Sequence, residues 1–206
     1  MLSPSALIWP KSEPFVMPQH ELRRRDFLGI TLTGAAALLW KPAGVSALGG
    51  KLPEIGDKAP DFDLPGTQGG GTTRDWNLDA WTGRWLVLYF YPRDFTSGCT
   101  IEAHGFQETL KDFNSNNCDI AAISADSVDD HESFCSSEGL DFTLLSDPEG
   151  KVSREYGSWM APYSLRHTFL IDPEGVLRAR WTGVRPVGHA QEVFKTLLAE
   201  QGNSIV

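Results

Sequence analysis

The sequence predicts an α/β domain with a mixed central sheet flanked by helices, and two observations support this fold class. Segments with strand-like patterning alternate with segments of helix-like patterning along most of the chain. Near the C-terminal end, two strand-like segments flank residues 172–175 (DPEG), whose composition is typical of a hairpin turn. Crossover connections need parallel strands, whereas a hairpin adds antiparallel ones, so the sheet should contain both kinds.

The first buried strand is expected over residues 85–91, a continuous apolar and aromatic run that Pro92 ends. A helix beginning near Cys99 should follow, because apolar residues recur there at intervals that place them on one side of a helix. Residues 120–124 are expected to form a second buried strand. The apolar side of the helix consists of Ala103, Phe106, Leu110 and Phe113.

The next helix is expected to begin after Ser127, because this residue and Asp130 resemble an N-terminal cap, and to end near Gly139. A short strand over residues 142–145 and a short helix over residues 151–156 should follow.

The arms of the hairpin are expected over residues 168–171 and 177–181, and a C-terminal helix over residues 190–201. The resulting order of elements is compatible with a thioredoxin-like fold. The apolar stripe of the last helix consists of Val193, Phe194, Leu197 and Leu198.

Residues 1–47 are expected to be an export signal rather than part of the fold. The apolar stretch over residues 27–40 is too short to span a membrane as a helix but suits a signal peptide. A small-residue pattern predicts cleavage after Ala47, which leaves a domain over residues 48–206; the alternative is an uncleaved anchor. Residues 23–28 (RRRDFL) resemble the core of a twin-arginine signal. That resemblance implies export of a folded protein to a bacterial periplasm, with no stable membrane insertion after cleavage.

The composition argues against nucleic acid, metal and organic cofactors as partners. The formal net charge is -9, and no run of five Lys or Arg residues follows the N-terminal region. The histidines lack the paired spacing of zinc ligands, and the glycines at 69–71 lack the Lys-Ser/Thr sequence of a phosphate-binding loop. The histidines considered are His104, His131, His167 and His189.

Cys99 is the residue most indicative of chemistry, because it lies where a buried strand ends and a helix begins. Backbone N–H groups of the first helical turn point toward such a sulfur and favour the thiolate, which is the nucleophilic form. Thr96, three residues earlier, can place its hydroxyl in the same space. The alternative is a small buried apolar cysteine without chemistry.

The spacing Pro92-x-x-x-Thr96-x-x-Cys99 matches the active-site motif of peroxiredoxins. Residues 89–106 (YFYPRDFTSGCTIEAHGF) resemble the peroxiredoxin Q branch, also called bacterioferritin comigratory proteins, and the likeness extends over about residues 52–198. The resemblance implies a thioredoxin-like fold and a thiol-dependent peroxidase, whose peroxidatic cysteine, Cys99, is oxidised to a sulfenic acid.

The same resemblance assigns three further residues to the site. Thr96 would hydrogen-bond the thiolate and the peroxide, and Pro92 would shield the sulfur from water. Arg166 matches the catalytic arginine of the family, a fixed charge that favours the thiolate and polarises the peroxide. The alternative for Arg166 is a surface charge at the end of a strand.

Many members of this branch carry a second cysteine five residues after the first, where this chain has His104. Of the two remaining cysteines, Cys118 is expected to be structural, because it lies next to a buried strand. In other members the second cysteine, which reacts with the oxidised first one, lies on the following helix. This likeness implies a disulfide between Cys99 and Cys135 and local unwinding around residues 96–105. The alternative is a buried Cys135 thiol and resolution by an external thiol.

The resemblance further implies a hydroperoxide substrate, a thioredoxin-like reductant and a monomer. Two other functions are alternatives for this chain: a thiol-disulfide oxidoreductase and a redox-sensing module without peroxidase activity. The oxidoreductase would need a second cysteine three residues from Cys99, where Thr96 and Glu102 stand.

Overall fold

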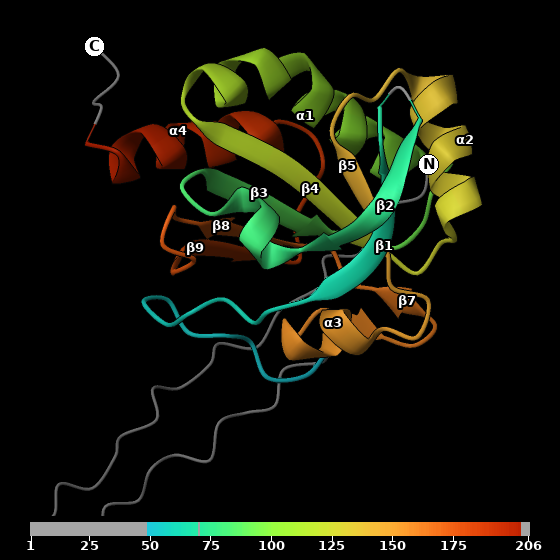
Figure 1. The fold of residues 1–206 in the computed structure, drawn as a ribbon, viewed down its shortest axis with the longest axis horizontal. Helices are drawn as coiled ribbons and strands as arrows, with labels where there is room; N and C mark the ends of the chain where they lie inside the picture. The colour runs from blue at the N-terminus through green and yellow to red at the C-terminus, as the bar shows by residue number, and fades with distance from the viewer. Residues whose placement is uncertain (1–48, 70, 203–206) are drawn as a thin grey trace, which may run out of the picture. The chain divides into compact units, whose positions relative to one another are not determined.

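The computed structural model describes residues 49–69 and 71–202. The predicted export signal, its cleavage site after Ala47 and the domain start at residue 48 lie outside the described residues. The described part contains a seven-stranded sheet and flanking helices, so the predicted α/β class with a mixed sheet is confirmed (Figure 1).

The strands follow the order β2-β1-β5-β4-β3-β8-β9 across the sheet. β3 is parallel to β4 and β4 to β5, whereas the other neighbouring pairs are antiparallel. The strands are β1 (Asp63–Gln68), β2 (Thr72–Asn77), β3 (Trp85–Phe90), β4 (Cys118–Ser124), β5 (Thr143–Ser146), β8 (His167–Ile171) and β9 (Leu177–Thr182). The other elements are η1 (Leu78–Trp81), α1 (Ser97–Ser115), α2 (Val128–Glu138), α3 (Lys151–Glu155), α4 (His189–Glu200) and the small pair β6 (Trp159–Met160) and β7 (Tyr163–Ser164).

The predicted helix after Ser127 is confirmed as α2, and its capping explains its limits. The Ser127 hydroxyl accepts a hydrogen bond from the Asp130 backbone N–H at 3.2 Å, and the Asp130 carboxylate accepts one from the Ser127 N–H. Gly139 ends the helix in the left-handed conformation, at φ +64°, that glycine adopts without strain.

The hairpin of β1 and β2 was not predicted. β1 contains Pro65 and Gly66, two residues that are depleted in strands, and in β2 only Trp76 is buried. Neither strand therefore shows the alternation of apolar and polar residues by which strands are recognised.

The sheet separates two apolar layers, because successive side chains of a strand point to opposite faces. Tyr89 of β3 belongs to the layer that also contains side chains of α1, α2 and α4, among them Cys99 and Cys135. We call this the cysteine layer. Leu88 belongs to the opposite layer, with side chains of η1 and α3. Figure 1 shows α1 and α4 together on one side of the sheet and α3 on the other.

The described residues contain neither a membrane-spanning helix nor a cluster of metal-binding side chains. No helix there has the length and apolar character needed to cross a membrane. No group of three or more His, Cys, Asp or Glu side chains in residues 49–69 and 71–202 could hold a metal ion.

Candidate active site

Cys99 is the third residue of α1, and its side chain is 2% exposed. The helix follows the end of β3 after a loop, residues 91–96, which we call the active-site loop. The first-turn amides of α1 have no partner within the helix, and the positive end of the helix dipole lies there. This end of a helix interacts favourably with negative charge placed beside it.

Arg166 supplies a second positive group to the same sulfur. Its Nη2 donates a hydrogen bond to Cys99 Sγ at 3.2 Å. The strand register explains how residues distant in sequence meet. His167 of β8 pairs with Phe90, the last residue of β3, so Arg166 lies beside the beginning of the active-site loop. The structure therefore brings Arg166 to Cys99 rather than leaving it as a surface charge.

Glu102 completes the group, and sequence reasoning did not identify it. It follows Cys99 by three residues, so both side chains lie on the same side of α1. Its carboxylate forms an ion pair with Nη1 of Arg166. The guanidinium of Arg166 thus contacts Glu102 with one nitrogen and the sulfur with another. Helical spacing from Cys99 was the signal that could have indicated this residue.

Burial raises the pKa of Glu102 to about 7, although the charge of Arg166 opposes this shift. The side chain is 1% exposed, and its Oε1 has no hydrogen-bond partner. An ionised carboxylate with one unsatisfied buried oxygen is costly, which accounts for the raised pKa of Glu102. The contact with Glu102 fixes the orientation of Arg166 beside the Cys99 sulfur.

Thr96 and Pro92 lie in the active-site loop. The hydroxyl of Thr96, the residue before α1, donates to the backbone carbonyl of Arg93 at 3.0 Å. The hydroxyl has one proton, so in this structure it is directed to the carbonyl rather than to Cys99. Donation to a thiolate or peroxide requires rotation of the Thr96 side chain. Pro92 is partly buried directly after Tyr91.

Cys135 lies in the last part of α2, 7% exposed, in the same layer as Cys99. Burial raises the pKa of the Cys135 thiol to about 12. Cys118, the first residue of β4, is fully buried, and burial raises its thiol pKa strongly as well. All three cysteines are free, so the structure represents the reduced protein.

A nearly buried cysteine at the start of a helix, contacted by an arginine, is an arrangement suited to a reactive thiol. The chain belongs to the AhpC/TSA family, whose sequence model matches residues 55–180. It is 39% identical to peroxiredoxin Bcp of Xanthomonas campestris over 150 residues, 68% of this chain and 92% of that one. Peroxiredoxin Bcp of Bacillus subtilis is 37% identical over 152 residues, 70% of this chain and 94% of that one.

Solved structures agree with these sequence relatives. A variant of peroxiredoxin Q from Xylella fastidiosa matches with a TM-score of 0.67 at 33% identity, over 74% of this chain and 99% of that one. The likeness confirms the thioredoxin-like fold and the resemblance to the peroxiredoxin Q branch. The protein is a thiol-dependent peroxidase, an oxidoreductase of the peroxiredoxin class.

Two structures of peroxiredoxin Q from Xanthomonas campestris bear on the cysteines. Each matches with a TM-score of 0.61 at 36% identity, over 66% of this chain; they cover 90% and 91% of their own chains. One cysteine is replaced by serine in each variant, and the two replaced positions are 36 residues apart. Cys99 and Cys135 have the same separation in this chain.

Proposed function

We propose that Cys99 is the peroxidatic cysteine and that the enzyme reduces hydrogen peroxide and organic hydroperoxides. The contact between Arg166 Nη2 and Cys99 Sγ is the observation that carries this proposal. An alkyl peroxide reduction activity is named for the Xanthomonas campestris bacterioferritin comigratory protein, which is 35% identical to this chain in the matched region.

The first step is attack of the Cys99 thiolate on one peroxide oxygen. The S–O bond forms as the O–O bond breaks, and the second oxygen leaves with a proton as water or an alcohol. Arg166 stabilises the thiolate and the charge that develops on the departing oxygen. The Thr96 hydroxyl, after rotating from the Arg93 carbonyl, holds the peroxide in line, and Pro92 limits access of water to the sulfur.

In the second step the Cys135 thiolate attacks the sulfenic acid on Cys99, a disulfide forms, and water leaves. A thioredoxin-like dithiol then reduces this disulfide and becomes a disulfide itself. The equal separation of the replaced cysteines in the Xanthomonas relative supports the choice of Cys135. The complete burial of Cys118 supports a structural role for the third cysteine.

Replacing Cys135 with serine should remove the second step and leave the first. In single-turnover stopped-flow fluorescence with hydrogen peroxide, the wild type should give two phases and Cys135→Ser only the first. On a nonreducing gel, the peroxide-treated wild type should run as an oxidised single chain, as expected for a monomer with an internal disulfide. Cys118→Ser is the matched control and should behave as the wild type. An internal disulfide in Cys135→Ser would refute the assignment.

We also propose that residues 1–47 direct export of the folded enzyme to a bacterial periplasm by the twin-arginine route. The paired arginines and the apolar stretch after them support this proposal. Replacing Arg24 and Arg25 by lysine should retain the full-length protein in the cytoplasmic fraction of a bacterial host. Arg23→Lys, which keeps the pair, should be exported. Equal distribution of both variants would contradict the proposed route.

A further inference from the structure

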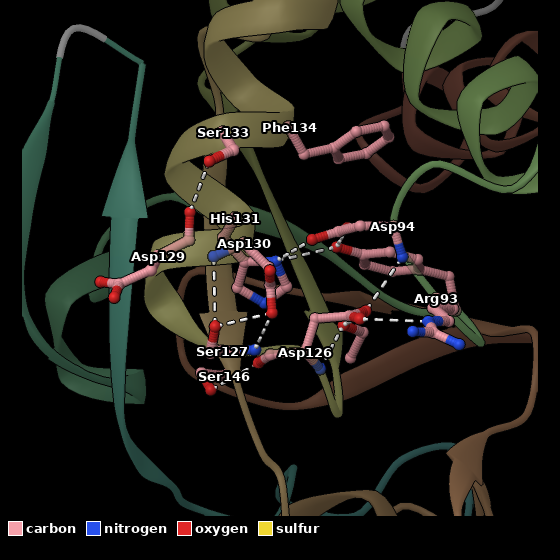
Figure 2. Close-up of polar contacts among 12 residues, drawn as sticks. Arg93, Asp94, Asp126, Ser127, Asp129, Asp130, His131, Ser133, Phe134 and Ser146 are labelled. Carbon is pink, nitrogen blue, oxygen red and sulfur yellow. Dashed lines mark hydrogen bonds and ion pairs between the residues drawn. The ribbon is translucent and has the colours of Figure 1, made fainter.

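The active-site loop contains a buried carboxyl group that the peroxidase mechanism does not use. Asp94 is 4% exposed, and its Oδ1 accepts a hydrogen bond from the Tyr91 hydroxyl at 2.7 Å. Its Oδ2 lies 2.7 Å from Nδ1 of His131, and its backbone N–H donates to Asp126 Oδ2 at 2.9 Å (Figure 2). We call these four residues the Asp94 network.

Asp94 and His131 form a hydrogen bond that is shielded from solvent. His131 is fully buried, and its Nε2 lies 3.2 Å from the backbone carbonyl of Leu145. A carbonyl can only accept, so Nε2 carries a hydrogen. The contact between Nδ1 and Oδ2 is then a hydrogen bond between two buried side chains.

This hydrogen bond joins the two segments that carry the redox cysteines. Asp94 lies in the loop that leads into α1 and Cys99. His131 lies in α2, one turn before Cys135, so both residues face the same side of that helix. Figure 2 shows the side chains of Asp94 and His131 directed toward each other.

Two neighbouring contacts link the same segments. Phe95 packs edge-on against Phe134 of α2, with the ring centroids 5.1 Å apart. The φ of Phe95 is +58°, a left-handed conformation that is strained for a bulky residue. His104 of α1 is paired with Glu138 of α2 at 2.9 Å, but His104 is 46% exposed, which weakens that pair. The Asp94 network is thus the buried polar link between the loop and α2.

Formation of the disulfide requires Cys135 to become accessible to Cys99. The Cys135 thiol is covered, and its raised pKa keeps it protonated, whereas attack on a sulfenic acid requires the thiolate. A disulfide also requires the two Cα atoms to come within about 4.4–6.8 Å, while each cysteine is held in a separate helix. Cys135 must therefore leave its buried position before it can react.

We propose that Asp94 and His131 are positioning residues whose hydrogen bond holds α2 against the active-site loop and sets the rate of disulfide formation. This inference rests on the proposed function. While the bond holds, the sulfenic acid on Cys99 persists. A second peroxide can then transfer an oxygen atom to it, giving a sulfinic acid and water or an alcohol. The strength of the bond thus determines how the sulfenic acid divides between disulfide and over-oxidation.

Two substitutions of His131 separate its two hydrogen bonds. The amide of His131→Asn reaches the position of Nδ1 and keeps a donor to Asp94. The amide of His131→Gln reaches the position of Nε2 and keeps only the bond to Leu145. In stopped-flow fluorescence of the reduced full-length protein with hydrogen peroxide, His131→Gln should form the disulfide at least about tenfold faster. The rate of the first phase in His131→Gln should stay within about twofold of the wild-type rate. His131→Asn should resemble the wild type in both phases.

Mass spectrometry after excess peroxide gives the second readout, in which His131→Gln should contain less sulfinic acid at Cys99 than the wild type. Tyr156→Phe is the control for general loss of stability, because it removes a hydrogen bond to the Pro60 carbonyl in the opposite layer. It should leave both phases unchanged. If His131→Gln does not fold, Tyr91→Phe removes one donor to Asp94 and should accelerate the second phase a few-fold.

An unchanged second phase in His131→Gln, or equal acceleration in His131→Asn, would overturn the inference. So would faster disulfide formation in Tyr156→Phe, because the effect would then follow from stability alone. Failure of the proposed function looks different: the wild type itself would show no first phase dependent on Cys99.

Discussion

Replacing Cys99 with serine is expected to abolish peroxide reduction while the fold stays intact. Serine fits the space of the buried cysteine, but its hydroxyl is not ionised near neutral pH and is a weak nucleophile. Loss of a catalytic nucleophile lowers the rate by about 10⁴-fold or more. Peroxide consumption with a dithiol reductant measures the effect, and circular dichroism checks the fold.

Cys135→Ser is the appropriate comparison for this experiment, because it removes another cysteine of the same layer. With an external thiol present, it should still consume peroxide. Peroxide consumption by Cys99→Ser at the wild-type rate would show that a different residue carries the oxidation.

Replacing Arg166 with glutamine is expected to slow oxidation of Cys99 by about 10²–10³-fold, the loss typical of removing one donor that stabilises developing charge. The substitution removes the hydrogen bond to Cys99 Sγ and the fixed positive charge beside it. The rate of the first stopped-flow phase at several peroxide concentrations measures this loss.

The same substitution leaves Glu102 buried without its ion pair, so it should also lower the free energy of unfolding. A double variant, Arg166→Gln with Glu102→Gln, separates the two effects. It should recover much of the stability measured by chemical denaturation but none of the oxidation rate. Recovery of the rate would mean that Arg166 acts only through the fold.

Most elements near Cys99 could be predicted, because local patterns determine them. The apolar run of β3, the apolar side of α1 and the capping residues of α2 are each contained in a short segment. The strands β1 and β2 lack such a local signal, because the pairing between them and the pairing of β1 with β5 define them.

The residues of the site also divide into those with a local sequence signal and those that depend on tertiary contacts. Cys99, Thr96 and Pro92 belong to one motif, and the resemblance to peroxiredoxins pointed to Arg166. Glu102 and the pair of Asp94 and His131 were not identified as partners. Their interactions join residues from different elements, and such contacts depend on how the helices pack onto the sheet. The orientation of the Thr96 hydroxyl toward the Arg93 carbonyl likewise depends on loop geometry that no spacing rule describes.

The division of the core into two layers has a consequence for evolution and engineering. In the proposed mechanism the cysteine layer, which contains Cys99 and Cys135, rearranges once in every turnover, whereas the opposite layer can stay packed throughout. Substitutions that pack the opposite layer more tightly can therefore increase thermal stability without slowing turnover. Substitutions that pack the cysteine layer more tightly should increase stability and slow turnover. Selection for durability and selection for speed thus act on opposite sides of one sheet.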